Sequence, residues 1–294
     1  MQIAANGIQL EVEDHGSPDG EPLVLIMGLG MQLVAWNEDF VLSLVKRGFR
    51  VLRFDNRDIG LSQSFDHLGM PNVAVEAMKH AVGLPVRSPY SLADMADDTI
   101  GLLDAFGISR AHVCGASMGG MVAQRIAQRH PQRLKSLTLM MTTSGARRLP
   151  GPSLRVRSAL LSRPADPKNL DSVVSHYVQL YKMIGSPGYP SSDEYLHQRL
   201  GMSVRRSHRP RGTARQLVAI AADGDRSPWL SRIGVPTQVL HGLADPLVPV
   251  AAGRDLAARI PNARLDLVEG MGHDLPQALW PRFADGISAA AARA

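Results

Sequence analysis

Three side chains of the types that cooperate in nucleophilic catalysis each follow an apolar segment of the chain. Ser117 comes shortly after His112–Cys114, Asp245 comes shortly after Thr237–Leu240, and His273 follows the last apolar run. A serine hydroxyl becomes a good nucleophile when a neighbouring imidazole takes its proton, and that imidazole needs a carboxylate to fix its tautomer. The sequence therefore predicts Ser117 as nucleophile, His273 as base and Asp245 as the orienting acid.

The segment around Ser117 reads Gly-Ala-Ser-Met-Gly-Gly over residues 115–120 and precedes a helical pattern. In a chain this rich in glycine, a Gly-x-Ser-x-Gly match arises by chance with a probability on the order of 0.1–0.2, so the pattern alone is weak. Its placement between a strand and a helix is informative, because small residues permit a strained turn that exposes the serine hydroxyl. The turn also places the Met118 amide at a helix N-terminus, where unpaired N–H groups stabilise developing negative charge.

Two other carboxylates lie near His273 in the sequence. Asp274 is its direct neighbour, but the side chains of adjacent loop residues generally diverge, and Glu269 lies before the segment Gly270–Gly272. The segment after the preceding apolar run, Met141–Gly145, contains no carboxylate. Asp245 is therefore the expected partner of His273.

Alternating strand and helix patterns position these residues. Short runs that are apolar on both faces are typical of strands in a parallel sheet, and they occur at residues 22–28, 49–55, 111–115, 134–141, 237–242 and 265–268. Helical spacing occurs between them, at residues 36–46, 92–106, 118–129, 251–260 and 276–292. This alternation predicts an α/β fold with a mostly parallel sheet between helix layers. An antiparallel hairpin is expected at residues 2–13, broken by Asn6-Gly7.

The alternation fails between Gly145 and Pro236, where prolines separate amphipathic stretches near residues 170–183, 194–204 and 213–222. These stretches predict short helices inserted between two strands. Four of the five tyrosines fall in this insert, and an insertion over one end of a parallel sheet usually shapes a pocket. We therefore expect a core of residues 1–145 and 233–294 and a helical cap over residues 146–232.

The net charge of +5 is concentrated in this insert, which has 15 basic and 6 acidic residues. Its basic run, Arg205–Arg211, lacks interleaved aromatic residues and any recognition motif. We therefore expect a solvent-exposed helix end or loop there and no nucleic-acid partner.

The remaining composition is that of an ordinary globular protein. With 45% hydrophobic and 20% charged residues, the chain is too apolar for intrinsic disorder. Cys114 is the only cysteine, which excludes an intrachain disulfide framework and fits a reducing compartment. The N-terminal residues lack a leader pattern, and no apolar stretch reaches about eighteen residues. We expect a cytoplasmic protein with no membrane partner and no metal or other cofactor; the sequence does not indicate the number of subunits.

Across nearly its whole length the chain resembles the α/β-hydrolase fold family. The segments that carry the resemblance are Met27–Gly30, Asp55–Ser62, the serine turn, Asp245 and Gly270–His273. The chain differs from most members in having Met27-Gly28 where they have His-Gly, and Arg57-Asp58 where they have Arg-Gly. With these differences it is most similar to the subgroup of aclacinomycin methylesterase and related carboxylesterases.

The resemblance implies a serine carboxyl-ester hydrolase that acts through an acyl-enzyme intermediate. It implies the same triad and assigns the oxyanion hole to the backbone amides of Leu29 and Met118, with Arg57 and Asp58 as scaffold. The methionines and other apolar residues near these loops favour an uncharged or weakly anionic ester of small to medium size with apolar bulk. We expect this substrate to be bound by Trp36, Tyr177, Tyr181 and Trp229.

Other activities, and a role without catalysis, are compatible with this fold. Metal-free haloperoxidases of the perhydrolase type have the same triad. Carbon–carbon bond hydrolases also have this triad, but they typically contain a segment similar to His-Gly-Gly-Gly-Pro-Gly, which is absent from this chain. A ligand-binding module can lose a catalytic residue, whereas Ser117, Asp245 and His273 are all present. The complete triad therefore favours an enzyme.

Overall fold

The structure, a computed structural model, describes residues 1–294 and contains one sheet of eight strands. The order is β1-β2-β4-β3-β5-β6-β7-β8; strands β3 to β8 run parallel, and β2 pairs antiparallel with both β1 and β4. The strands are β1 (Gln2–Ala5), β2 (Ile8–His15), β3 (Glu21–Ile26), β4 (Phe49–Phe54), β5 (Ala111–Ala116), β6 (Leu134–Met140), β7 (Thr237–Gly242) and β8 (Arg264–Val268). None of the helices is long and apolar enough to cross a membrane.

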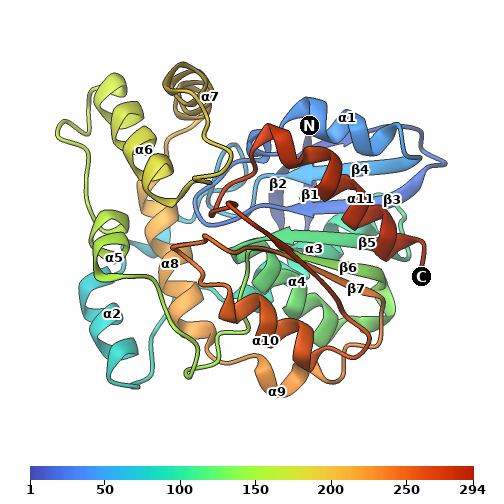
Figure 1. The fold of residues 1–294 in the computed structure, drawn as a ribbon. Coiled ribbons are helices and arrows are strands. Elements are labelled where there is room, and N and C mark those ends of the chain that lie inside the picture. Colours follow the sequence, from blue (N-terminus) through green and yellow to red (C-terminus); the bar gives the residue numbers. More distant parts are fainter.

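Helices cover both faces of the sheet (Figure 1). The larger buried cluster lies under α3 (Leu92–Ala105), α4 (Met118–Arg129) and α10 (Ala251–Arg259). A second cluster lies on the opposite face, under α1 (Glu38–Val45) and α11 (Trp280–Ala291). The order of strands and helices therefore builds a three-layer core around the sheet.

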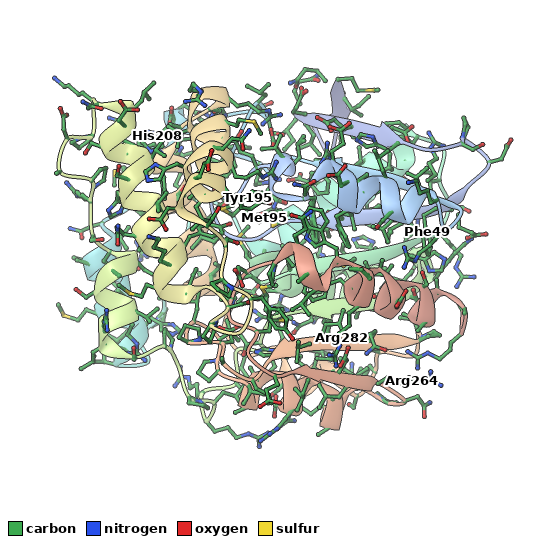
Figure 2. All side chains as sticks on the ribbon, turned by 45° about the horizontal axis from the view of Figure 1, so that its top comes forward. Phe49, Met95, Tyr195, His208, Arg264 and Arg282 are labelled. Carbon is green, nitrogen blue, oxygen red and sulfur yellow. The ribbon has the colours of Figure 1, made fainter.

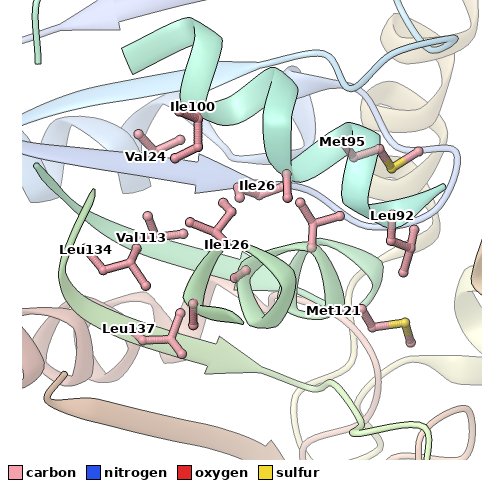
Figure 3. Close-up of a cluster of buried hydrophobic side chains, with 14 of the residues drawn as sticks. Val24, Ile26, Leu92, Met95, Ile100, Val113, Met121, Ile126, Leu134 and Leu137 are labelled. Atoms are coloured by element: carbon pink, nitrogen blue, oxygen red, sulfur yellow. The ribbon is translucent and has the colours of Figure 1, made fainter. Parts of the chain in front are cut away.

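Strand β3 shows why the strands read as continuous apolar runs. Its side chains alternate between the two faces of the sheet. Val24 and Ile26 join the cluster under α3 and α4 (Figure 3), whereas Leu23 and Leu25 join the cluster under α1 and α11. Because both faces are covered by helices, both sets of side chains must be apolar.

The expected core elements lie within two residues of their observed bounds, with one exception. The expected helix at residues 276–292 begins with a 3₁₀ turn, Gln277–Leu279, and α11 starts only at Trp280. One helix outside the insert was not expected, namely α2 (Val73–Ala81), which packs on an inserted helix and leaves Val75 and Met78 exposed.

Five helices lie between β6 and β7, where the sequence indicated three amphipathic stretches; the first and the last of the five were not expected. The five helices are α5 (Leu154–Leu160), α6 (Leu170–Ile184), α7 (Asp193–Arg206), α8 (Pro210–Asp223) and α9 (Ser227–Leu230). The side chains of Asn169 and Ser192 cap the first turns of α6 and α7. These two helices pack together around a small buried cluster of their own and stand beyond one end of the sheet (Figure 1). The division into a core and a cap domain stays a prediction.

The basic run Arg205–Arg211 is not simply a solvent-exposed face, and for two of its arginines the expectation is wrong. Arg206 donates to Asp55 Oδ2 at 2.7 Å, and the Asp55 side chain is fully buried. Arg209 donates to the Ser62 carbonyl oxygen at 2.6 Å. The sequence pattern missed these contacts because their acceptors lie about 150 residues away in the chain, on the loops after β4.

Arg215 of α8 and Asp58, in the loop after β4, form an ion pair in which both side chains are fully buried. Nε lies 2.6 Å from Oδ2 and Nη2 lies 2.8 Å from Oδ1. Burial by itself raises the pKa of Asp58, but hydrogen bonds from Arg215, the Phe65 amide and Tyr90 outweigh it and lower that pKa. Asp58 is therefore ionised at neutral pH, and the pair fastens the insert to the core.

We predict that Arg215→Met destabilises the folded protein by about 3–5 kcal/mol at neutral pH, because it leaves the Asp58 carboxylate buried without its partner. Urea unfolding followed by circular dichroism measures the difference. The double variant Arg215→Met/Asp58→Asn removes the unpaired charge and should recover part of the loss. Since the pKa of Asp58 is lowered in the fold, the wild type loses this contribution as the pH falls below about 3.9, and the difference should shrink there. Equal stability of Arg215→Met and wild type at pH 7 would contradict the assignment.

Candidate active site

Ser117 lies on a sharp turn between β5 and α4. Its φ is 54° and its ψ is −119°, a conformation that L-residues rarely adopt. Glycines on both sides make the turn possible. A Cβ on Gly115 would lie 2.2 Å from the Gly119 carbonyl oxygen, and a Cβ on Gly119 would lie 2.0 Å from the Ile26 carbonyl oxygen. The small residues of the motif are thus required by close backbone packing, and they let α4 approach β3.

The hydroxyl of Ser117 and the ring of His273 lie within hydrogen-bonding distance. His273 Nε2 is 3.0 Å from Ser117 Oγ, and His273 Nδ1 is 2.7 Å from Asp245 Oδ2. A carboxylate accepts, so Nδ1 carries the proton and Nε2 is left to accept a proton from the serine. The structure therefore brings together the three residues that the sequence selected, although they lie up to 156 positions apart.

The Asp245 carboxylate is oriented by its own loop. Its second oxygen, Oδ1, accepts hydrogen bonds from the amides of Leu247 at 2.9 Å and Val248 at 2.8 Å. The carbonyl oxygen of Val248 lies 2.8 Å from Nε2 of His241. Burial lowers the pKa of His241, so this ring is neutral and donates Nε2–H to that carbonyl. His241 thus supports the loop that holds Asp245.

The other two carboxylates near His273 are placed elsewhere. Glu269 is exposed. Asp274 accepts a hydrogen bond from the Ser186 hydroxyl, and burial raises the pKa of this carboxyl despite that bond. The geometry favours Asp245 as the partner of His273.

Sequence reasoning missed Ser186, which fastens the loop of His273 to the insert. Its hydroxyl oxygen accepts from the Gly272 amide at 2.9 Å and donates to Asp274. The His273 amide donates to the Ile184 carbonyl oxygen at 2.7 Å. A Cβ on Gly272 would lie 2.2 Å from the Gly185 carbonyl oxygen, so the two loops touch through their backbones. No local signal marks Ser186, because its partners lie more than 80 residues away.

The expected oxyanion-hole amides border the same space. Met118 is the first residue of α4, and its N–H therefore has no acceptor within the helix. The Leu29 amide, just beyond β3, makes no hydrogen bond to the rest of the chain. A Cβ on the preceding Gly28 would lie 3.1 Å from Cβ of Ser117, so this loop approaches the serine closely. Both amides are available to an oxygen bound beside Ser117.

A cavity of about 210 Å³ opens onto Ser117 and His273. Its wall is mainly apolar and comes from the loop after β3, from α6 and α7 of the insert, and from α11. Two of the four expected substrate-binding residues, Trp36 and Tyr181, line it.

The other two, Tyr177 and Trp229, do not line this cavity, and their role in substrate binding stays a prediction. Tyr177 lies one helical turn before Tyr181, and its hydroxyl is 3.3 Å from Nε2 of His208, a residue between α7 and α8 that Figure 2 labels. Trp229 lies on the short helix α9, where the chain returns to the core, and is partly exposed beneath the Arg232 guanidinium. Aromatic character alone did not separate residues facing the cavity from those facing other helices.

No group of three or more histidine, cysteine, aspartate or glutamate side chains lies close enough together to hold a metal ion. A serine, a histidine and an aspartate joined in this way at the C-terminal edge of a parallel sheet define a site of the serine hydrolase type.

Comparison with known proteins agrees with this geometry. The family model of the alpha/beta hydrolase fold matches residues 21–276, and the chain belongs to the α/β-hydrolase fold family. This confirms the family and the fold expected from the sequence.

Within this family, the chain is similar to several individual proteins. Rhodomycin D methylesterase DauP from Streptomyces sp. (strain C5) is 28% identical, over 98% of this chain and 96% of that protein. A putative non-heme haloperoxidase from Mycobacterium phage D29 is 31% identical, over 91% of this chain and 86% of that protein. The crystal structure of the enol-lactonase from Burkholderia xenovorans LB400 superposes with a TM-score of 0.75, at 26% identity and 99% coverage of both chains. The similarity to methylesterases and the expected enzyme class are confirmed.

We predict that Ser186→Ala slows the reaction of Ser117 with a fluorophosphonate by roughly 10- to 100-fold, because the loop of His273 loses its fastening to the insert. The rate of labelling, followed by mass spectrometry, measures this. Ser158→Ala, an exposed serine on α5 of the same insert, is the matched control and should label at the wild-type rate. Far-UV circular dichroism checks that the fold is retained. Labelling of Ser186→Ala at the wild-type rate would show that the fastening is dispensable.

Proposed function

We propose that the protein is a serine carboxyl-ester hydrolase that works through an acyl-enzyme intermediate. The observation that carries the proposal is the 3.0 Å contact between Ser117 Oγ and a His273 ring whose other nitrogen is held by Asp245. A serine hydroxyl hydrogen-bonded to an oriented imidazole is the arrangement that acyl transfer requires.

In the first half of the reaction, Ser117 Oγ attacks the ester carbonyl carbon and its proton passes to His273 Nε2. The negative charge moves to the carbonyl oxygen, which the amides of Leu29 and Met118 stabilise. The tetrahedral intermediate collapses, the carbon–oxygen bond to the alcohol breaks, and His273 returns the proton to the departing alcohol oxygen. In the second half, a water oxygen attacks the acyl carbon and gives a proton to His273 Nε2. The bond between that carbon and Ser117 Oγ then breaks, and His273 returns the proton to Oγ, which releases the carboxylic acid and the free serine.

The cavity supports a small or medium ester with apolar bulk as the substrate. Its wall contains Met27, Leu29, Met31 and Trp36 on the core side and Tyr181 on the insert side. The similarity to a methylesterase fits an ester of a small alcohol. We propose that residues 146–232 act as a cap that sets specificity over a core of residues 1–145 and 233–294, since two of its helices form one wall of the cavity.

The similarity to a putative haloperoxidase supports a second candidate activity with the same triad, the perhydrolysis of a carboxylic acid by hydrogen peroxide. Hydrolysis remains the main proposal. Bromide-dependent halogenation in the presence of acetate and peroxide, compared directly with ester turnover, decides between them. A ligand-binding protein without catalytic activity would show neither halogenation nor ester turnover.

The expected surroundings of the protein remain part of the proposal. Two arginines of the basic run contact the core, which leaves fewer charges for nucleic acid and supports a small-molecule substrate as the main partner. Cys114 is fully buried and unpaired, which fits a cytoplasmic location.

We predict that Ser117→Ala lowers kcat for p-nitrophenyl ester hydrolysis by roughly 10⁴-fold or more, because the members of a triad act as a unit. Steady-state release of p-nitrophenol measures the loss. A fluorophosphonate should label the wild type at Ser117 and leave the variant unlabelled. Near wild-type turnover by the variant would refute the proposed nucleophile.

We also predict that Asp245→Asn lowers kcat by about 10²- to 10⁴-fold and leaves KM little changed, because an amide cannot fix the required tautomer of His273. Glu269→Gln, on the same side of the molecule but exposed, is the matched control and should retain wild-type kcat. If the effects of the two substitutions were exchanged, Asp245 would not be the orienting acid.

A further inference from the structure

One face of α7 forms part of the cavity wall. Its residues Tyr195, Leu196, Arg199, Leu200 and Ser203 line the cavity, and their spacing places them on one side of the helix. Figure 2 shows Tyr195 where the inserted helices meet the core. Among the residues that line this mainly apolar cavity, Arg199 is the only lysine or arginine.

The Arg199 guanidinium has no acidic partner. No carboxylate oxygen lies within 4.0 Å of it, and its one hydrogen bond runs from Nη2 to the Val34 carbonyl oxygen at 2.5 Å. In this respect Arg199 differs from Arg206 and Arg215, which each form an ion pair with a buried aspartate of the core. A half-buried cation next to apolar surface is costly unless something completes its hydrogen bonds.

Two tyrosine hydroxyls in the same wall also lack strong partners. The Tyr181 hydroxyl meets only the sulfur of Met31, at 3.8 Å, and the Tyr195 hydroxyl makes no hydrogen bond within the chain. Burial and the nearby Asp274 carboxyl raise the pKa of Tyr181, and the positive charge of Arg199 acts on the same hydroxyl in the opposite direction. The hydroxyl therefore stays protonated and is available as a donor near the guanidinium.

The other ionisable groups of the wall do not neutralise Arg199. His273 is bound to Ser117 and Asp245. Asp274 is the one carboxyl group that lines the cavity, and it is held by Ser186, while burial raises its pKa. The wall thus combines a free cation with free hydroxyl donors, and a planar guanidinium binds a carboxylate through two parallel hydrogen bonds.

The charge of the whole insert points the same way. The insert contains 15 basic and 6 acidic residues. Arg148, Arg206 and Arg215 pair with carboxylates of the core, and the element that covers the cavity keeps an excess of positive charge. Such an excess concentrates anions at a site between low-dielectric walls.

We propose that Arg199, with Tyr181 and Tyr195, binds a carboxylate on the substrate, so that the preferred esters are monoesters of dicarboxylic acids. This inference rests on the proposed ester hydrolysis and adds a charged group to the apolar substrate described above. The carboxylate meets Arg199 on α7 while the ester carbonyl lies beside Ser117.

The test compares anionic and neutral esters of the same shape. Mono-p-nitrophenyl succinate, glutarate and adipate are each paired with the neutral ester in which an isopropyl group replaces the carboxylate. Arg199→Met should lower the anionic-to-neutral ratio of kcat/KM by about 10- to 100-fold, mainly through KM for the anionic ester. Arg205→Met removes an exposed arginine of the same helix that does not line the cavity, and should leave the ratio unchanged. Tyr195→Phe should lower the ratio by a smaller factor.

Salt dependence gives a second measurement. For wild type, kcat/KM for the anionic ester should fall as ionic strength rises from about 0.05 to 0.5 M, and the value for the neutral ester should stay nearly constant. An equal loss on both esters in Arg199→Met would show that Arg199 only supports the Val34 loop and would overturn the proposal. A ratio unchanged by Arg199→Met would overturn it as well.

A binding assay separates this proposal from the proposed function. Ser117→Ala protein should bind intact mono-p-nitrophenyl glutarate at least about 10-fold more tightly than the neutral ester by calorimetry, and Ser117→Ala/Arg199→Met should lose that preference. If wild type hydrolyses no ester but this preference is present, the proposed hydrolysis fails and the carboxylate site stands. If esters are hydrolysed but the preference is absent, the carboxylate site fails and the hydrolase proposal stands.

Discussion

The close approach of the β5–α4 turn to β3 is the constraint on which the rest of the site depends. Ser117 keeps a backbone conformation that costs on the order of 1–3 kcal/mol, and it does so because Gly119 lies directly against the Ile26 carbonyl. The turn follows directly on the central strand β5, whose position is fixed by pairing with β3 on one side and β6 on the other. The strain is thus offset by the packing of the two main clusters, and the serine hydroxyl is fixed at the edge where the loops of Asp245 and His273 end.

Most of the core could be predicted from the sequence because its signals are local. Strand β3 reads as a continuous apolar run since its alternate side chains enter two different clusters. Ser117, Asp245 and His273 could be selected because each follows such a strand, and the C-terminal ends of parallel strands meet at one edge of the sheet. The glycines around Ser117 also indicated a strained turn, and this inference needs no knowledge of distant residues.

What the sequence could not reveal are contacts between distant segments. The helix α2 was missed because its apolar side chains are partly exposed and its packing partner is α8, which lies in the insert. Ser186 carries no local mark, since its role arises only when the loop after α6 meets the loop of His273. Tyr177 and Tyr181 lie on the same helix with the same spacing that lines a pocket, and only the position of His208 shows that Tyr177 is covered by another part of the insert.

Charge links these distant contacts to the assembly of the site. The insert has more basic than acidic residues, whereas the rest of the chain has 17 basic and 21 acidic residues, and ion pairs cross between them at Arg206–Asp55 and Arg215–Asp58. Moving the insert away would break both ion pairs and leave each aspartate without its cation. The same movement would break the hydrogen bond from the His273 amide to the Ile184 carbonyl. Docking of the insert and positioning of the His273 ring are therefore coupled, so the charges that fasten the insert also help to keep His273 within hydrogen-bonding distance of Ser117.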